Sequence, residues 1–229
     1  NSGAILDAKT MEDKIDGKDI IGLGEMMDFP GVINANDNIL DKLLIGRDTI
    51  IDGHGPLIED KDLNAYVAAG IKTEHECSTA KEMIERLRLG MYILIREGSA
   101  TRDLSKLIGV VNKNNLSRIL FCTDDKHPED LLNEGSIDYN IKKAIELGLD
   151  PIDAYTIASL NPALCYNLKE KGAIAPGFDA DIVVLGSLEK VNVIEVYKKG
   201  KLIAKDYNAL FDSSPYLPEY MKNSVSIKD

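Results

Sequence analysis

Short apolar runs alternate with amphipathic segments along the first half of the chain. The runs are rich in β-branched residues and lack strict alternation, as expected for strands buried on both faces of a parallel sheet. They span residues 19–25, 49–54, 70–76, 91–99 and 118–125, and helices are expected between them over residues 61–69, 79–89 and 104–111. This order predicts five successive βα units.

The segment 79–89 carries the clearest helix signal. Thr79 and Glu82 have the spacing of a capping box, and Gly90 is placed to end the helix. One face of the helix, which we expect to be buried, carries Ala80, Met83, Ile84 and Leu87.

Five βα units favour the fold class α/β, as part of a (β/α)₈ barrel in which the carboxyl ends of the strands carry the functional groups. A complete barrel needs about 250 residues, so only a portion is expected. A doubly wound sheet remains the alternative architecture. Two further helices are expected over residues 137–147 and 152–166, the second with Pro151 in its first turn.

The pattern changes after these helices. Residues 171–186 and 191–206 read as strands punctuated by Gly and Pro, and the second segment predicts a hairpin that turns at Lys199 and Gly200. We expect antiparallel β-structure outside the barrel here. From residue 207 on, the Pro, Ser and Asn content predicts a linker.

The formal net charge of −11 disfavours nucleic acid and anionic membrane surfaces as partners, because both require a basic face. No apolar run reaches the ~18 residues of a membrane span, and no secretory signal opens the sequence. Cys77, Cys122 and Cys165 lack CxxC spacing, which favours a reducing, cytoplasmic location. Cys77 and Cys122 lie at strand ends in apolar context and are expected to be buried thiols. The first residues contain no Met and read as the interior of a domain, so we expect a piece of a longer protein.

All three histidines follow apolar runs: His54 and His75 at the ends of the second and third, and His127 after the fifth. Carboxylates stand at the same strand ends, among them Glu25 and Asp124. Spacings of 29, 21 and 49 residues separate Glu25, His54, His75 and Asp124, with one whole unit inside the longest interval. A crossover takes roughly 20–30 residues, so these groups fall at successive strand ends. Imidazole and carboxylate on such a frame predict a divalent-metal site.

Several motifs, in order, closely resemble the adenine deaminases of the amidohydrolase superfamily. They are GEMMDFPGVIN (residues 24–34), IDGHGP, DLNAYVAAGI, EHECSTAKE, RLRLGMYILIREGSA and FCTDDKHPEDLLNEGSIDY. The later KGAIAPGFDADIVVL resembles the return of an amidohydrolase barrel to a small β-sandwich. The resemblance implies strands four to eight of a barrel over residues 1–168, sandwich strands over 169–206, and a linker or tail over 207–229.

By this resemblance, Glu25 is the carboxylate of strand four that bridges two metal ions. His54 and His75 are the imidazole ligands of strands five and six, and Asp124 is the aspartate of strand eight that binds metal and handles protons. The two ions would be manganese or iron, with zinc as an alternative. The His-x-His pair of strand one is absent from the sequence. We therefore expect this segment alone to be inactive, or slower by several orders of magnitude.

The implied reaction is the hydrolytic deamination of adenine to hypoxanthine and ammonia, a step of purine salvage and adenine catabolism, with Asp124 and Glu76 moving protons. Other amidohydrolases, which act on cyclic amides or N-acyl substrates, share these ligands and remain an alternative. A catalytically incomplete segment is the second alternative. The oligomeric state stays open, a homo-oligomer included.

Several roles also stay open. Glu76 would point away from His75 if the strand continued, which favours a structural role. Asp125 competes with Asp124 as the ligand. Arg96 and Ser99 at the end of the strand 91–99 either contact the purine or serve packing and ion pairing. His127 either orients the substrate or caps the turn before Pro128.

Overall fold

The computed structural model describes residues 5–15, 17, 19–212 and 217–222. Five parallel strands follow one another in the first part of the chain: β1 (Gly22–Met26), β2 (Ile50–Gly53), β3 (Thr73–Glu74), β4 (Tyr92–Arg96) and β5 (Ile119–Cys122). β1 pairs with β2, and β4 lies between β3 and β5. A backbone hydrogen bond of 2.9 Å from Lys72 N to Ile51 O links the two groups of strands. The predicted βα order is confirmed.

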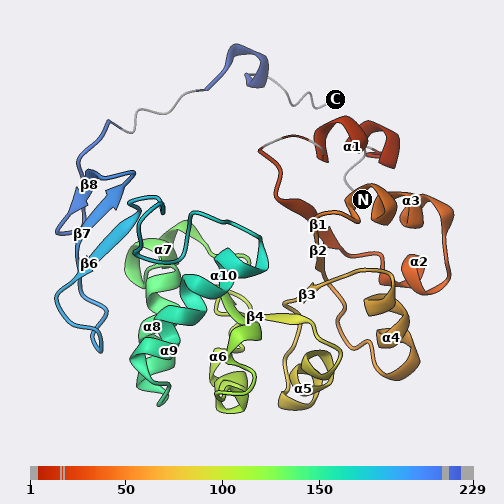
Figure 1. Ribbon diagram of the computed structural model, residues 1–229, viewed down its shortest axis with the longest axis horizontal. Helices are drawn as coiled ribbons and strands as arrows, with labels where there is room; N and C mark the ends of the chain where they lie inside the picture. Colours follow the sequence, from red (N-terminus) through yellow and green to blue (C-terminus); the bar gives the residue numbers. More distant parts are fainter. Residues whose placement is uncertain (1–4, 16, 18, 213–216, 223–229) are drawn as a thin grey trace, which may run out of the picture. The chain divides into compact units, whose positions relative to one another are not determined.

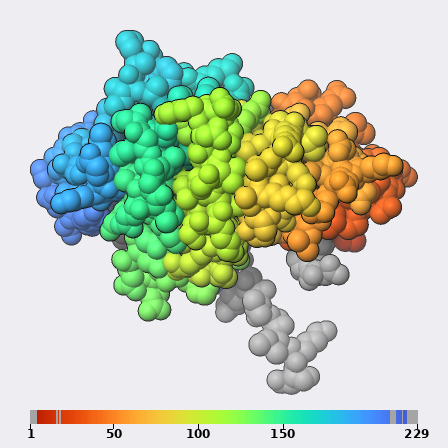
Figure 2. Space-filling view, turned by 90° about the horizontal axis from the view of Figure 1, so that it is seen from below, coloured from red at the N-terminus to blue at the C-terminus, as the bar shows by residue number. Residues whose placement is uncertain are grey.

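Helices precede, connect and follow the five strands. In this part of the chain they are α1 (Ala8–Ile15), α2 (Phe29–Ile33), α3 (Asp37–Gly46), α4 (Asp60–Ala68), α5 (Ala80–Arg88), α6 (Leu104–Leu107), α7 (Pro128–Asn133), α8 (Ile137–Glu146), α9 (Pro151–Ala158) and α10 (Leu160–Cys165). Short 3₁₀ turns η1 (Ile108–Val110) and η2 (Leu116–Arg118) precede β5. Figure 1 shows α4, α5 and α6 along one side of β3 and β4. On the outside of these helices, the side chains of the yellow to green segments form a continuous surface (Figure 2).

The core lies between the strands and these helices. Its fully buried members include Ile93 and Ile95 of β4, which alternate with less buried neighbours, and Ile119 of β5. Met83 of α5 and Leu104 of α6 pack into the same cluster. Apolar side chains occupy both faces of β5, since the consecutive residues Ile119 and Leu120 are both buried. Polar groups are therefore expected at the strand ends.

Helix α5 begins with the predicted capping box. Thr79 Oγ1 accepts a hydrogen bond from Glu82 N at 3.3 Å, and Glu82 Oε2 accepts from Thr79 N at 2.9 Å. The predicted apolar face is buried only in part, at Met83 and, less completely, at Leu87. Ala80 and Ile84 are exposed, and Met83 shares the buried face with the charged residues Glu82 and Arg86. Arg86 turns inward because its guanidinium has hydrogen-bond acceptors in the loop after β2.

The cap of α5 should stabilise the fold in a pH-dependent way. Burial raises the pKa of Glu82, but hydrogen bonds from Ser78 and Thr79 outweigh it, so the pKa lies below the ordinary 4.5. A carboxylate whose pKa is lower in the folded than in the unfolded state stabilises the fold at pH values above its unfolded pKa. This contribution is lost as the pH falls through the folded-state pKa. We expect Glu82→Ala to reduce the free energy of unfolding by about 1 kcal/mol at pH 7, and by progressively less below pH 4.5. Urea unfolding at pH 7 and pH 4 measures this change in the free energy of unfolding. An equal loss of unfolding free energy in Arg88→Ala, a substitution of an exposed residue, would contradict the prediction.

One predicted helix is broken. The segment expected as a single helix over residues 152–166 consists of α9 and α10, with a non-helical Ser159 (φ −130°, ψ −64°) between them. Pro162 lacks an N–H and its ring collides with the carbonyl of the preceding turn, which accounts for the interruption. Pro151 does occupy the first turn of α9, as predicted. The predicted helix 104–111 is also shorter, because α6 passes into η1.

The later part of the chain forms an antiparallel sheet in the order β6-β7-β8-β9. Its strands are β6 (Ile182–Leu185), β7 (Val193–Lys198), β8 (Lys201–Lys205) and β9 (Asn208–Ala209). The hairpin between β7 and β8 turns at Lys199 (φ +49°) and Gly200 (φ +75°), as predicted. Two expectations need correction: residues 171–181 form no strand, and the segment expected to be a linker begins with β9, which pairs with β8. Its other part includes residues 213–216 and 223–229, which lie outside the described residues.

Contacts divide the chain into two units. The first comprises Asn1–Phe178 with Ser187–Val191, and the second comprises Asp179–Gly186 with Asn192–Asp229. This division places residues 169–178 with the βα units, whereas the second part was expected to begin at residue 169. The short helical turn η3 (Glu219–Met221) belongs to the second unit. Within the described ranges, no helix is both long enough and apolar enough to cross a bilayer.

Candidate functional site

An irregularity in β1 positions Glu25. Leu23 pairs with Ile51, but the next pair is Met26 with Gly53. Between these two pairs β1 advances by three residues and β2 by two, so β1 contains one extra residue. Such a bulge turns side chains away from the regular alternation, and it occurs here at the end of the strand. The Glu25 carboxylate reaches His54 as a result, with Oε2 3.1 Å from Nδ1.

His54 directly follows β2, and its backbone is held by Tyr66 of α4. The Tyr66 hydroxyl accepts from His54 N at 2.9 Å and donates to Met26 O at 2.7 Å. Tyr66 is fully buried, and burial raises the pKa of its hydroxyl. One phenol therefore ties the ends of β1 and β2 together, next to Glu25 and His54.

Removing this hydroxyl should loosen both strand ends. In Tyr66→Phe, the Met26 carbonyl and the His54 N–H each lose a partner, which we expect to cost about 1–3 kcal/mol of unfolding free energy. Tyr155→Phe removes a hydroxyl whose hydrogen bond to Leu188 O is exposed, and should cost less than about 0.5 kcal/mol. Chemical denaturation of both variants compares them; equal losses would show that Tyr66 has no special role.

His75 and Glu76 lie beyond the end of β3, which is only two residues long. The strand stops because the buried Glu74 carboxylate takes the next backbone donors: its Oε1 accepts from His75 N at 2.9 Å and from Glu76 N at 2.8 Å. The alternation of a continuing strand is therefore lost. Both side chains reach the same cluster, with Glu76 Oε1 3.5 Å from His75 Nε2. The condition under which Glu76 would point away, a continuing strand, is not met.

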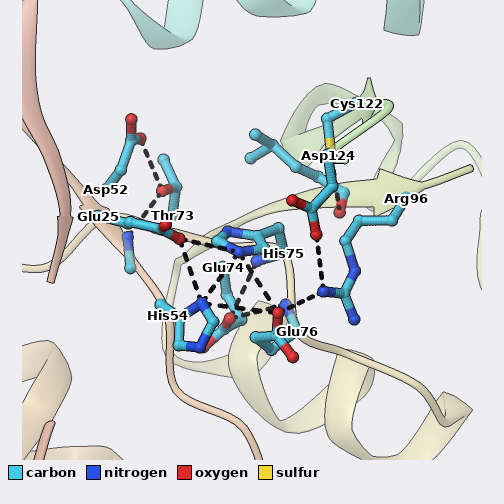
Figure 3. Close-up of polar contacts among 12 residues, drawn as sticks. Glu25, Asp52, His54, Thr73, Glu74, His75, Glu76, Arg96, Cys122 and Asp124 are labelled. Atoms are coloured by element: carbon cyan, nitrogen blue, oxygen red, sulfur yellow. Dashed lines mark hydrogen bonds and ion pairs between the residues drawn. The ribbon is translucent and has the colours of Figure 1, made fainter. Parts of the chain in front are cut away.

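Glu25, His54 and His75 form a triangle of ligand atoms (Figure 3). Its sides are 3.1 Å for both contacts of Glu25 Oε2 and 3.2 Å between His54 Nδ1 and His75 Nε2. Ligands bonded at about 2.1 Å to one cation lie about 3.0 Å apart in octahedral and about 3.4 Å apart in tetrahedral geometry. Protons alone cannot bridge all three edges of the triangle. Two protonated ring nitrogens would face each other, and with one or neither protonated at least one edge joins two lone pairs. The donor set therefore fits a divalent cation.

Asp124 and Glu76 form a second group with His75, whose ligand atoms all lie within 4.8 Å of one another. Arg96 at the end of β4 joins the two carboxylates: Nη1 donates to Asp124 Oδ2 at 3.0 Å and to Glu76 Oε1. Its Nη2 donates to the buried Asp103 at 3.3 Å. Burial lowers the pKa of Arg96, but these carboxylates outweigh it and leave the pKa above its ordinary value.

The backbone distinguishes Asp124 from Asp125. Asp124 has a left-handed conformation (φ +54°) just after β5, a strained geometry that occurs at functional sites. It belongs to the cluster with His75, whereas Asp125 is in neither group of candidate ligands among the described residues. The carbonyl of Asp125 accepts from Ser99 N at 2.9 Å, so this residue joins the loops after β4 and β5.

Ser99 and His127 lie in the same pair of loops. Ser99 Oγ donates to Asp130 Oδ2 and accepts from His127 N at 2.8 Å. His127 itself is exposed at the start of α7. These contacts tie α7 to the end of β4, while the predicted contacts of Ser99, Arg96 and His127 with a substrate stay predictions.

Several polar residues that hold the site were missed by the sequence analysis. Glu74 and Arg86 are buried charges, and Asp52 accepts from Thr73 Oγ1 at 2.8 Å and from Tyr166 OH at 2.9 Å. Asp52 precedes His54 by two positions, and this spacing along β2 was an available signal. The Cys122 thiol at the end of β5 is not acidic, because burial and then Asp124 raise its pKa to about 12.

The chain is similar to adenine deaminases over most of its length. It is 46% identical to that of Petrotoga mobilis over 92% of this chain and 37% of the relative, and 48% identical to that of Desulfitobacterium hafniense over 90% and 36%. With the enzyme of Nitratidesulfovibrio vulgaris the identity is 43%, over 100% of this chain and 40% of the relative. The chain thus spans about two fifths of the length of these curated relatives.

Solved structures support the fold. A β-aspartyl dipeptidase from Fervidobacterium islandicum AW-1 superposes with a TM-score of 0.65 at 20% identity, covering 90% of this chain and 62% of that one. An ochratoxinase from A. niger gives a TM-score of 0.52 at 19% identity, over 72% and 45%. Residues 5–203 match the amidohydrolase family, so that the match runs from α1 through most of β8. The chain belongs to the amidohydrolase family.

Proposed function

We propose that the protein containing these residues hydrolyses adenine to hypoxanthine and ammonia. The observation that carries this proposal is the convergence of Glu25, His54 and His75 on one triangle of ligand atoms, with Glu76 and Asp124 beside it. The similarity to adenine deaminases supports the choice of a purine over other amidohydrolase substrates. The role would be in purine salvage or adenine catabolism.

Glu25, His54 and His75 would hold one divalent cation, and Asp124 would be a ligand in the neighbouring group. When bound, a divalent cation at these side chains supplies Lewis acidity, which makes water nucleophilic at neutral pH. Nitrogen and oxygen ligands together suit manganese, iron or zinc. The resemblance favours manganese or iron and two ions, with Glu25 shared between them.

Two carboxylates are placed to move protons. Asp124 would take a proton from the attacking water as the oxygen bonds to C6 of the purine, and pass it to the amino nitrogen as the C–N bond breaks. Glu76 would take the second proton of the water and deliver it to a ring nitrogen, so that both protons of the water are accounted for. Arg96 holds both carboxylates through one nitrogen, which fixes the distance between them before substrate binds.

The test is a substrate comparison on the full-length protein, with and without metal. Adenine loss and ammonia release should be observed with Mn²⁺ or Fe²⁺, should disappear after chelation and should return when metal is restored. Dihydroorotate and hydantoin serve as cyclic-amide controls. Turnover of a cyclic amide with adenine left intact would contradict the proposal and favour another amidohydrolase activity.

A cytoplasmic location is part of the proposal. Cys77, Cys122 and Cys165 are all free thiols, and burial raises the pKa of each. Unpaired, unreactive cysteines suit a reducing compartment. A small-molecule substrate also suits the acidic composition, which offers no basic face to nucleic acid.

A further inference from the structure

We propose that Glu74 is a positioning residue for the metal centre, with Arg86 as its buried partner. The inference rests on the proposed function, because it concerns the loops that carry His54 and His75. Glu74 itself has no atom among the candidate ligands of the described residues. It would act only through the backbone that it holds.

Glu74 joins the ends of two strands. Its Oε1 accepts the N–H groups of His75 and Glu76, and its Oε2 accepts Gly55 N at 2.9 Å. Gly55 directly follows His54. The carboxylate therefore holds the residue after one imidazole ligand and the backbone N–H of the other. Three backbone donors on one carboxylate fix the separation of the two loops.

Arg86 completes this arrangement from α5. Its Nη2 donates to Gly55 O at 2.9 Å and to Ile58 O at 3.1 Å. Both polar groups of Gly55 are thus held, the N–H by Glu74 and the carbonyl by Arg86. The Arg86 Nε lies 3.8 Å from Glu74 Oε2, which makes the pair an ion pair without a hydrogen bond at this nitrogen.

The burial of this pair argues for a specific role. Glu74 is 0% exposed and Arg86 is 1% exposed. A buried ion pair is costly to desolvate and adds little net stability compared with apolar packing, so stability alone explains it poorly. The hydrogen bonds of the pair instead hold the two segments that carry His54 and His75, whose Nδ1 and Nε2 atoms lie 3.2 Å apart. Groups that orient metal ligands typically change metal affinity 10–100-fold when they are replaced.

Glu74→Gln tests the idea with minimal change of shape. Glutamine has one accepting oxygen, so its NH₂ group must face either Gly55 N–H or the N–H groups of His75 and Glu76. Glu97→Gln is the matched control. Glu97 is also 0% exposed just beyond a strand, but it pairs with Lys143 and Arg102 rather than with the ligand loops.

The experiment measures Mn²⁺ affinity of the full-length protein by competition with a chelator, and amide hydrogen exchange of peptides spanning residues 54–58 and 74–78. We expect Glu74→Gln to bind Mn²⁺ about 10–100-fold more weakly and to exchange faster in both peptides. Glu97→Gln should lose stability while its Mn²⁺ affinity stays within about twofold of the wild type, a change too small to reflect lost ligand orientation. Wild-type affinity in folded Glu74→Gln, or equal losses in the two variants, would overturn the inference.

Arg86→Lys decides the question if Glu74→Gln does not fold. Lysine keeps the charge but lacks the fork that holds Gly55 O and Ile58 O, so weaker Mn²⁺ binding is expected and wild-type binding would overturn the inference. The outcomes also separate the two proposals. A wild-type protein that binds Mn²⁺ but leaves adenine intact would refute the deaminase activity alone, whereas one that binds no divalent metal would refute both.

Discussion

His75→Ala in the full-length protein should abolish metal binding at the triangle and lower kcat/KM for adenine by about 10³-fold or more. Among the residues that the structure describes, this imidazole is the one side chain present in both groups of candidate ligands, so its loss affects both at once. A catalytic metal supplies several kcal/mol of transition-state stabilisation, and about 1.4 kcal/mol corresponds to tenfold in rate. Metal content after gel filtration and initial rates with adenine measure the two effects.

His127→Ala is the matched histidine control for metal binding. His127 is exposed at the start of α7 and is in neither candidate ligand group of the described part of the chain. Its metal content should equal that of the wild type. If His127→Ala raised KM for adenine without loss of metal, the predicted substrate contact would be supported; loss of metal from this variant would contradict the ligand assignment.

The candidate ligands were predictable because their signal is local. Glu25, His54 and His75 each follow an apolar run, and parallel strands bring their carboxyl ends to one edge. Conformation at these ends was less predictable. The bulge in β1 decides where Glu25 points, and it depends on pairing with β2, which is distant in sequence. The early end of β3 decides where Glu76 points, and it depends on the Glu74 side chain accepting the next two backbone N–H groups, which strand propensity does not encode.

The buried polar residues that hold the site could not be predicted from the hydrophobic patterns that predicted the strands and helices. Glu74 lies inside an apolar run, and its partner Gly55 is 19 residues away, so no local signal marks the contact. On α5, the rule that apolar residues face inward selected Ile84, whereas the buried side carries Glu82 and Arg86. Buried polar networks follow tertiary hydrogen bonding, which hydrophobic periodicity does not encode.

Asp124→Asn should reduce kcat for adenine by about 10²–10⁴-fold, the usual contribution of a general acid–base group. The amide of Asn cannot take up the proton of the attacking water. In the wild type, Arg96 Nη1 donates to the carboxylates of both Glu76 and Asp124. The substitution leaves Glu76 as the only carboxylate partner of this nitrogen. Steady-state kinetics with adenine, together with metal content, separates lost proton transfer from lost metal.

Asp125→Asn is the matched control, one residue away in the same exposed turn. Its site contact is through the backbone carbonyl, which accepts from Ser99 N and is unchanged by the substitution. We therefore expect kcat for Asp125→Asn to stay within about threefold of the wild type, less than the tenfold that 1.36 kcal/mol would produce. A larger loss of kcat in Asp125→Asn than in Asp124→Asn would contradict this assignment. The left-handed backbone at Asp124 (φ +54°) would then orient Asp125, and the proton-transfer role would belong to the Asp125 carboxylate.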